Sequence, residues 1–208
     1  MLQPLPLPKA RIEALTDGIF AVTMTLLVLD VHFPAQFAAG VGAEALALVD
    51  LIDNYFISFA VLAVFWIGHL RLMRRLRDPD ATFVAQNLAF LFLTTLVPPL
   101  TALLGNHPEL PRASVLYGAN LFLLLCLELA MWRRVCLGLT DGSLDDAHSA
   151  WLHVRSRYAL ALGVVLAAIV VALGEIAVGV SRGLAPWLYL LLLGLGRLRP
   201  VLASARPA

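Results

Sequence analysis

The first apolar segment of the chain, residues 11–30 (RIEALTDGIFAVTMTLLVLD), carries polar groups that a purely lipid-facing helix would not need. Arg11 and the Thr16-Asp17 pair precede the apolar run, and Thr25 lies within it. Polar groups in a membrane span are costly, so they usually face protein or water and mark function. The chemistry open to these groups is hydrogen bonding and ion coordination. The pattern therefore favours a first helix that lines a pore.

The composition indicates a membrane protein. Hydrophobic residues make up 61% of the 208-residue chain and the mean hydropathy is +0.86, whereas a soluble domain is closer to half apolar. The excess lies in long blocks, which predicts an all-α integral membrane protein. The formal net charge of +1 gives no signature of nucleic-acid binding. Because no metal-ligand cluster, nucleophile elbow or phosphate loop is found, we expect neither an enzyme nor a cofactor.

The apolar blocks predict six transmembrane helices, because one span needs about 20 mostly apolar residues. The expected spans are residues 13–32, 46–73, 83–104, 114–135, 158–179 and 185–198. The second is long enough to begin as an interfacial helix, and the last is short. Pro98-Pro99 is expected to kink the third span, since each proline removes a backbone hydrogen-bond donor.

The distribution of basic residues predicts the orientation. With the N-terminus inside, 13 of the 15 Lys and Arg residues fall in inner segments, and only Arg112 and Arg182 fall outside. This asymmetry is the positive-inside pattern and places both termini in the cytoplasm. We expect one domain over residues 1–208, with cytoplasmic segments at 1–10, 136–157 and 199–208. The Arg74-Arg75-Arg77 cluster is expected to contact anionic membrane lipid.

One stripe of the first helix combines apolar side chains with a single hydroxyl. Each helical residue turns by about 100°, so residues three, four and seven apart share a face. The stripe around Val22 contains Leu15, Gly18, Val22, Thr25, Leu26 and Leu29. It has two interpretations. Either it contacts lipid or another helix, or it lines a pore in which apolar rings gate by dewetting and threonine oxygens meet a partly dehydrated cation.

Several motifs in order resemble the transmembrane protein 175 family of potassium channels. Arg11 and Leu15-Thr16-Asp17-Gly18 resemble its Arg-x-x-x-Phe-Ser-Asp-Gly signature, with Leu in place of Phe and Thr in place of Ser. The family's next three helices are also resembled in order. The second helix resembles FWIGH (65–69), the third resembles NL (87–88) and VP (97–98) with TALLG (101–105), and the fourth resembles Tyr117 with NL (120–121). The likeness covers roughly residues 11–135.

The resemblance implies a potassium-preferring cation channel of the bacterial type, with one six-helix unit per subunit and four subunits around a pore lined by the first helix. Val22 and Leu29 would then form hydrophobic constrictions, and Thr25 would contact K⁺ transiently as the selectivity residue. Gly18 and Leu26 would line the pore beside them. The expected partners are K⁺, membrane lipid and three further copies of the chain, and the expected location is the bacterial plasma membrane.

The resemblance also implies a supporting network behind the first helix. Its members would be Arg11, Thr16, Asp17, Trp66, His69 and Asn87. The Trp66 indole and the His69 imidazole can donate hydrogen bonds to the Asp17 carboxylate. Arg11 is equally well explained as a positive-inside anchor.

A secondary or proton-coupled transporter is the alternative function. It would place its substrate near His69, Asn87 and Glu128, because Glu128 is an ionisable residue within the fourth span. Against it, the sequence shows no internal repeat and no pair of Gly- or Pro-broken helices at matching positions. A membrane enzyme is disfavoured, because no nucleophile, base or metal ligands converge on one membrane face.

Overall fold

The computed structural model describes residues 8–29, 41–107, 110–138, 144–179, 188–189 and 191. In this part of the chain the elements follow the order α1 (Lys9–Leu29), α2 (Val41–Arg75), α3 (Ala81–Thr95), α4 (Val97–Asn106), α5 (Pro111–Gly138) and α6 (Leu144–Val178). The all-α prediction is therefore confirmed for the described residues.

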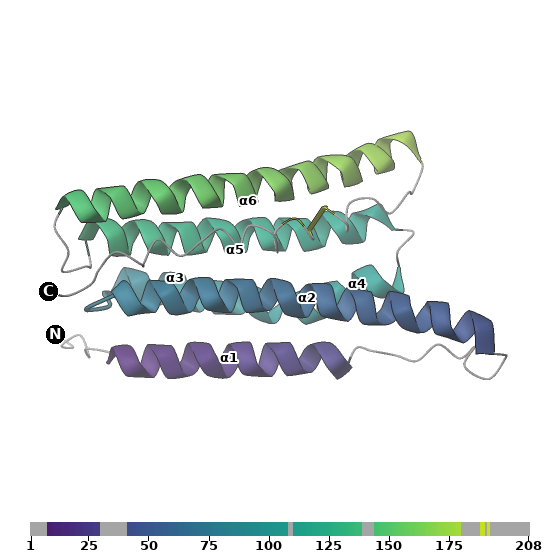
Figure 1. The fold of residues 1–208 in the computed structure, drawn as a ribbon, viewed down its shortest axis with the longest axis horizontal. Coiled ribbons are helices and arrows are strands. Elements are labelled where there is room, and N and C mark those ends of the chain that lie inside the picture. The colour runs from purple at the N-terminus through teal and green to yellow at the C-terminus, as the bar shows by residue number, and fades with distance from the viewer. Residues whose placement is uncertain are drawn as a thin grey trace, which may run out of the picture.

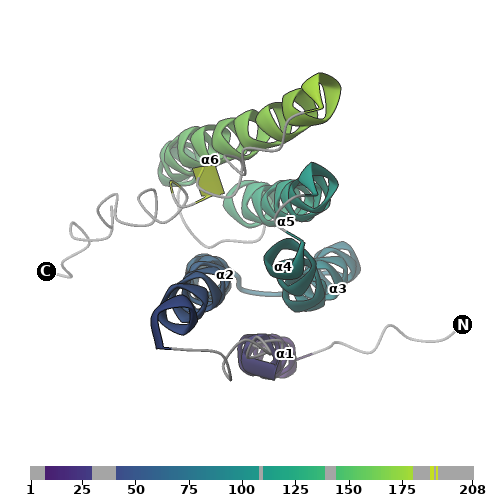
Figure 2. The same cartoon turned by 90° about the vertical axis from the view of Figure 1, so that its right-hand side faces the viewer.

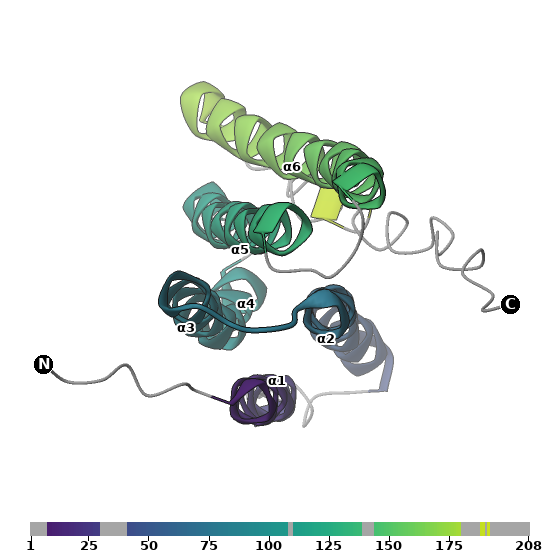
Figure 3. The ribbon, with the colours of Figure 1, turned by 90° about the vertical axis from the view of Figure 1, so that its left-hand side faces the viewer.

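The helices are stacked in layers, with α6 at one edge and α1 at the other (Figure 1). Between them lie α5 and then a layer made of α2 beside α3 and α4. End-on views show that α1 meets α2, α3 and α4 on one side only (Figures 2 and 3). The first helix therefore has neighbours on one face and none, within the described chain, on the opposite face.

Five segments of the described chain are long and apolar enough to cross a membrane. They are Lys9–Leu29, Tyr55–Arg75, Ala81–Asn106, Pro111–Gly138 and His148–Val178. They correspond to the first five predicted spans. Of the sixth predicted span, 185–198, only Leu188, Tyr189 and Leu191 are described, and the C-terminal segment 199–208 lies outside the described residues.

The third span is broken where the sequence predicts a kink. α3 ends at Thr95 and α4 begins at Val97, with Pro98 in the first turn of the second helix. At the break the Leu96 N–H bonds to the Leu93 carbonyl, three residues back. The Asn120 side chain of α5 donates to the same carbonyl at 3.1 Å. The proline pair thus interrupts the helical ladder, because Pro98 and Pro99 cannot donate to the Thr94 and Thr95 carbonyls four residues back, and Asn120 ties the neighbouring Leu93 carbonyl to α5.

The segment 136–157, expected to be a loop, is helical at every residue that the structure describes. α5 continues to Gly138 and α6 begins at Leu144, so residues 144–157 are helical. The expectation was wrong because a search for apolar blocks detects only the part of a helix that fits the bilayer. A helix can continue into water through polar residues with adequate helical propensity.

Phe90 of α3 is the point at which α1, α2 and α3 meet. Its ring lies 6.0 Å from that of Phe20 in α1 and 6.1 Å from that of Phe65 in α2. The His69 ring of α2 stacks on it at 5.3 Å and 9°. Because Phe90 is fully buried, this aromatic cluster fixes the spacing of α1, α2 and α3.

Asp80 fixes the connection between α2 and α3. One carboxylate oxygen accepts the Phe83 N–H at 2.8 Å and caps α3, and the other pairs with Arg134 of α5. The Phe83 N–H, and after it Arg134, hold the pKa of this carboxyl below its ordinary value, although partial burial opposes them. The carboxylate therefore stabilises the fold above the ordinary pKa of 3.8, and this contribution is lost as the pH falls below it.

We expect Asp80→Asn to reduce the loss of stability that the wild type shows below about pH 4, because asparagine still caps a helix but does not titrate. Asp80→Ala should also lower the free energy of unfolding by about 1 kcal/mol at neutral pH, through loss of the cap. Thermal unfolding in detergent between neutral and acidic pH measures both effects. Asp78→Asn is the matched control, because Asp78 is 91% exposed. An equal effect of both Asn variants would contradict the assignment.

Candidate ion pathway and its supporting network

α1 has one buried face and one exposed face. The buried face consists of Ile12, Thr16, Phe20, Thr23 and Leu27. The exposed face includes every member of the stripe defined above: Leu15, Gly18, Val22, Thr25, Leu26 and Leu29. Val22 is 54% exposed and Leu29 is 70% exposed. The structure therefore leaves the whole stripe without a partner in the described chain.

Thr25 is the polar member of this stripe. Its hydroxyl donates to the Val22 carbonyl at 2.8 Å, three residues back in the same helix. Since the hydroxyl proton is used in this bond, the oxygen keeps lone pairs that can face outward. Gly18, two turns before Thr25, has open space where a side chain would lie. The stripe thus offers apolar surface, one position without a side chain at Gly18 and one exposed threonine, Thr25.

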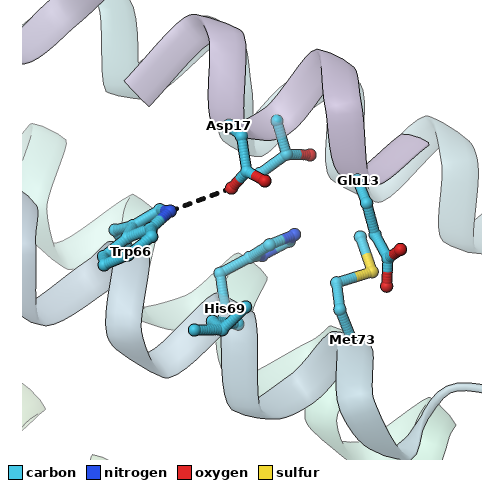
Figure 4. A pocket seen from close by; sticks show the side chains of 7 residues that line it. Glu13, Asp17, Trp66, His69 and Met73 are labelled. Atoms are coloured by element: carbon cyan, nitrogen blue, oxygen red, sulfur yellow. Dashed lines mark hydrogen bonds between the residues drawn. The ribbon is translucent and has the colours of Figure 1, made fainter. Parts of the chain in front are cut away.

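Two hydrogen bonds attach the opposite side of α1 to its neighbours. The Trp66 indole of α2 donates to Asp17 at 2.9 Å (Figure 4). The Asn87 amide of α3 donates to the Thr16 hydroxyl at 3.2 Å, and both of these residues are buried. Interhelical hydrogen bonds of this kind contribute about 0.6 to 2 kcal/mol each in a membrane. They hold α1 in a defined rotation, which determines the face that carries Thr25.

His69 and Arg11 stand apart from these bonds. The His69 ring is 2% exposed, and neither ring nitrogen has a hydrogen-bond partner among the described residues. It lies beside Asp17 without a bond to it (Figure 4). Arg11 is exposed and forms no ion pair within the described chain. The structure thus brings five of the six expected network residues together and leaves Arg11 outside.

A cavity of about 170 Å³ lies between α1 and α2 on this side. Its walls include Glu13, Thr16 and Asp17 of α1 and Trp66, His69 and Met73 of α2. Sequence reasoning did not include Glu13 and Met73. The helical period could have predicted both residues. Glu13 precedes Asp17 by four residues and Met73 follows His69 by four, so each pair lies on one helix face.

Glu128 lies elsewhere in the bundle. It is 2% exposed, its Oε1 atom has no partner among the described residues, and its carboxyl hydrogen-bonds Tyr158 of α6. A Cβ atom at Gly68 of α2 would lie 2.5 Å from this Oε1, so the glycine makes room for the carboxyl. Glu128 does not line the cavity that contains His69. The structure therefore does not unite His69, Asn87 and Glu128 in one substrate site.

Comparison with known proteins identifies the family. A family model described as the endosomal/lysosomal potassium channel TMEM175 matches residues 11–98. A potassium channel of Streptomyces collinus is 31% identical over 158 residues, which are 73% of this chain and 76% of that protein. The chain belongs to the TMEM175 family. The resemblance drawn from the motifs is thereby confirmed.

Two further similar proteins extend the match. A potassium channel of Chamaesiphon minutus is 34% identical over 131 residues, 60% of this chain and 64% of that protein. The alignment therefore spans just under two thirds of that relative's length. The crystal structure of a lysosomal potassium-selective TMEM175 homolog from the same organism matches with a TM-score of 0.69 at 28% identity. That match covers 88% of this chain and 97% of the other.

We expect Thr16→Val to lower the free energy of unfolding by about 1 to 2 kcal/mol, because the buried Asn87 amide would lose its acceptor. Thermal or denaturant unfolding in detergent measures the change. In an Asn87→Leu background the same substitution should cost much less. Thr23→Val is the matched control, since the Thr23 hydroxyl is equally buried but has no hydrogen-bond partner within the described part of the chain. Equal costs for Thr16→Val and Thr23→Val would contradict a role for the Asn87 bond.

Proposed function

We propose that this TMEM175 family member is a potassium-preferring cation channel in which four copies of the chain surround a pore lined by α1. The observation that carries the proposal is the exposed stripe of α1, which is apolar apart from Gly18 and the Thr25 hydroxyl. A helix at the edge of the bundle can place such a stripe on a symmetry axis. The names of its relatives as potassium channels support the same function.

Each part of the stripe has a role in this pore. Rings of Val22 and Leu29 form hydrophobic constrictions, which oppose hydration and so limit conduction. A ring of Thr25 oxygens between them replaces part of the hydration shell of K⁺. Gly18 and Leu26 line the pore on either side of Val22. No covalent step and no cofactor takes part.

The membrane arrangement completes the proposal. Six transmembrane helices, the sixth over residues 185–198, place both termini in the cytoplasm of a bacterial cell. One end of the bundle holds the starts of α1, α3 and α6 and the ends of α2 and α5 (Figure 1). This arrangement supports the placement of the basic segments on the same side of the membrane. That side is the cytoplasm by the positive-inside rule. The tails and the Arg74-Arg75-Arg77 segment meet the aqueous phase and the lipid headgroups there.

The direct test is ion flux in liposomes that contain the purified full-length protein. Fast, passive flux that favours K⁺ over Na⁺ is expected. Uptake that requires a proton gradient would instead indicate the transporter, and Glu128→Gln should then abolish it. If folded and oligomeric protein shows no flux under a K⁺ gradient or a Na⁺ gradient over a range of pH, the channel proposal is overturned.

A further inference from the structure

One side of α2 carries an exposed apolar stripe. The helix packs on α1, α4 and α5, and all three lie to one side of it (Figures 2 and 3). On the other side lie Phe56, Ala60, Ala63 and Ile67, all within about 40° of Ile67 around the helix. Phe56 is 63% exposed and Ile67 is 39% exposed. These four residues are called the α2 stripe below.

Two arginines continue the α2 stripe toward the end of the helix. Arg71 and Arg74 follow Ile67 by four and seven residues, so they lie on the same face. Arg74 is exposed and Arg71 is half-buried. Neither forms an ion pair with a carboxylate among the described residues. An apolar surface thus leads directly to two cations that lack a counter-charge in this part of the chain.

The other arginines at this end of α2 have different surroundings. Arg75 lies close enough to Cys136 of α5 for its charge to act on the thiol, and Arg77 pairs with Asp78 at 3.7 Å. The structure therefore divides the basic cluster that the sequence shows here. Only the pair on the α2 stripe is left for an anion from outside the described chain.

The depth of Arg71 in the membrane favours such an anion. The span Tyr55–Arg75 has 21 residues, or about 32 Å at 1.5 Å per residue, close to the thickness of the hydrocarbon core. Arg71 is four residues, about 6 Å, from the end of this span. A guanidinium at this depth is costly unless it reaches the interface or meets an anion. A phosphate group at the membrane surface satisfies both conditions.

The length of the α2 stripe matches one leaflet of a bilayer. From Ile67 back to Phe56 it extends about 16 Å, and half of the hydrocarbon core is about 15 Å. An acyl chain whose headgroup lies beside Arg74 can therefore run along the whole stripe. Between the two larger residues stand Ala60 and Ala63, whose small side chains allow the chain to lie close to the helix.

We propose that Arg71, Arg74 and the α2 stripe form a binding site for one anionic phospholipid. The two guanidinium groups bind the headgroup phosphate, to which each can donate two parallel hydrogen bonds. One acyl chain lies along the stripe. A zwitterionic headgroup would bring a second cation beside the arginines, so a headgroup with net negative charge is preferred. That the lipid belongs to the cytoplasmic leaflet rests on the proposed orientation, whereas the site itself does not.

Native mass spectrometry of the full-length protein in detergent tests the site. The probes are dioleoylphosphatidylglycerol, which is anionic, and dioleoylphosphatidylcholine, which is zwitterionic. We expect one retained phosphatidylglycerol per chain and no retained phosphatidylcholine. Arg71→Gln/Arg74→Gln should weaken phosphatidylglycerol binding by about tenfold to thirtyfold, because two interactions with the anionic headgroup are lost. Equal retention of the two lipids by the wild type would overturn the proposal.

Arg133→Gln/Arg155→Gln is the matched control. Both arginines are exposed and lie in the halves of α5 and α6 that are at the same end of the bundle, so the same two charges are removed there. Phosphatidylglycerol binding should not change in this variant. An equal loss in both double variants would indicate a general effect of charge and overturn the site. Arg71→Lys/Arg74→Lys keeps the charges but not the planar guanidinium groups, and it should weaken binding by about threefold.

Two further measurements test the contact with the acyl chain. Glycerol 3-phosphate has the phosphate but no chain, and it should not displace phosphatidylglycerol. Displacement at equal concentration would indicate a site for soluble phosphate and overturn the proposal. Ala63→Trp places a bulky ring on the α2 stripe and should weaken binding, whereas Ala159→Trp, at an exposed position of α6, should not. Unchanged binding in Ala63→Trp would contradict the role of the stripe.

The same spectra report which partner covers the α2 stripe. If Arg71→Gln/Arg74→Gln separates the subunits while each keeps its lipid, a second copy of the chain covers the stripe and the proposal is overturned. Because binding is measured without ion flux, its result supports or overturns the lipid site whether or not the protein conducts. Failure of the channel proposal and failure of the lipid site are therefore distinguishable.

Discussion

Val22→Ser is expected to raise potassium flux by about tenfold or more. In the proposed pore, four Val22 side chains form a constriction that is costly to hydrate, and serine replaces two methyl groups with a small hydroxyl. A reduction of about 1.4 kcal/mol in the barrier corresponds to a tenfold increase in rate. Liposome flux, normalised to the amount of folded protein, measures the effect.

Val28→Ser is the matched control for this substitution. Val28 is in the same helix and is exposed to nearly the same extent, 52% against 54% for Val22. It lies about 120° around the helix from Val22, outside the stripe. Its replacement should leave flux unchanged. Equal flux in the wild type and Val22→Ser, from protein that is folded and oligomeric, would remove Val22 from the pore.

Thr25→Val is expected to lower the ratio of potassium to sodium permeability by about threefold to tenfold, the equivalent of one lost hydrogen bond per site. The variant keeps the shape of the side chain but removes the oxygen that would face the ion. Bi-ionic potentials in planar bilayers measure the ratio, because they are independent of the number of channels.

Thr95→Val controls for the general effect of removing a hydroxyl. Thr95 is an exposed threonine of α3 that donates to the Phe92 carbonyl at 2.7 Å, three residues back, as Thr25 does to Val22. It is not part of the stripe, so its replacement should not change the ratio. A permeability ratio that is unaltered in Thr25→Val would contradict the selectivity role.

The sequence was most informative where a pattern depends on local geometry. The stripe around Val22 follows from the helical period alone, and the structure places all its members on the exposed face. The break at Pro98-Pro99 follows from the missing backbone donors. These features do not depend on neighbouring helices, so the amino-acid sequence alone is sufficient to predict them.

Features that join distant segments were harder to predict. Asp80 and Arg134 are 54 residues apart, and no local pattern pairs them. Glu128 gave a signal as a charge in an apolar span, but its contact with Gly68 depends on how α2 crosses α5. For Asp17, the sequence predicted hydrogen bonds from both Trp66 and His69; the structure contains the bond from Trp66, whereas His69 has no hydrogen-bond partner among the described residues. Whether a side chain reaches an acceptor on another helix depends on distances that only the folded chain defines.

The break in the third span also bears on how this protein enters a bilayer. At 1.5 Å per residue, the 15 residues of α3 extend about 22 Å and the 10 residues of α4 about 15 Å, whereas the hydrocarbon core is about 30 Å thick. Neither piece crosses alone, and the proline pair leaves polar carbonyls exposed at the joint. Asn120 bonds to the adjacent Leu93 carbonyl and so holds the joint, but it belongs to a helix that the ribosome makes later. Stable insertion of the third span is therefore completed only after the following helix has emerged and packed beside it.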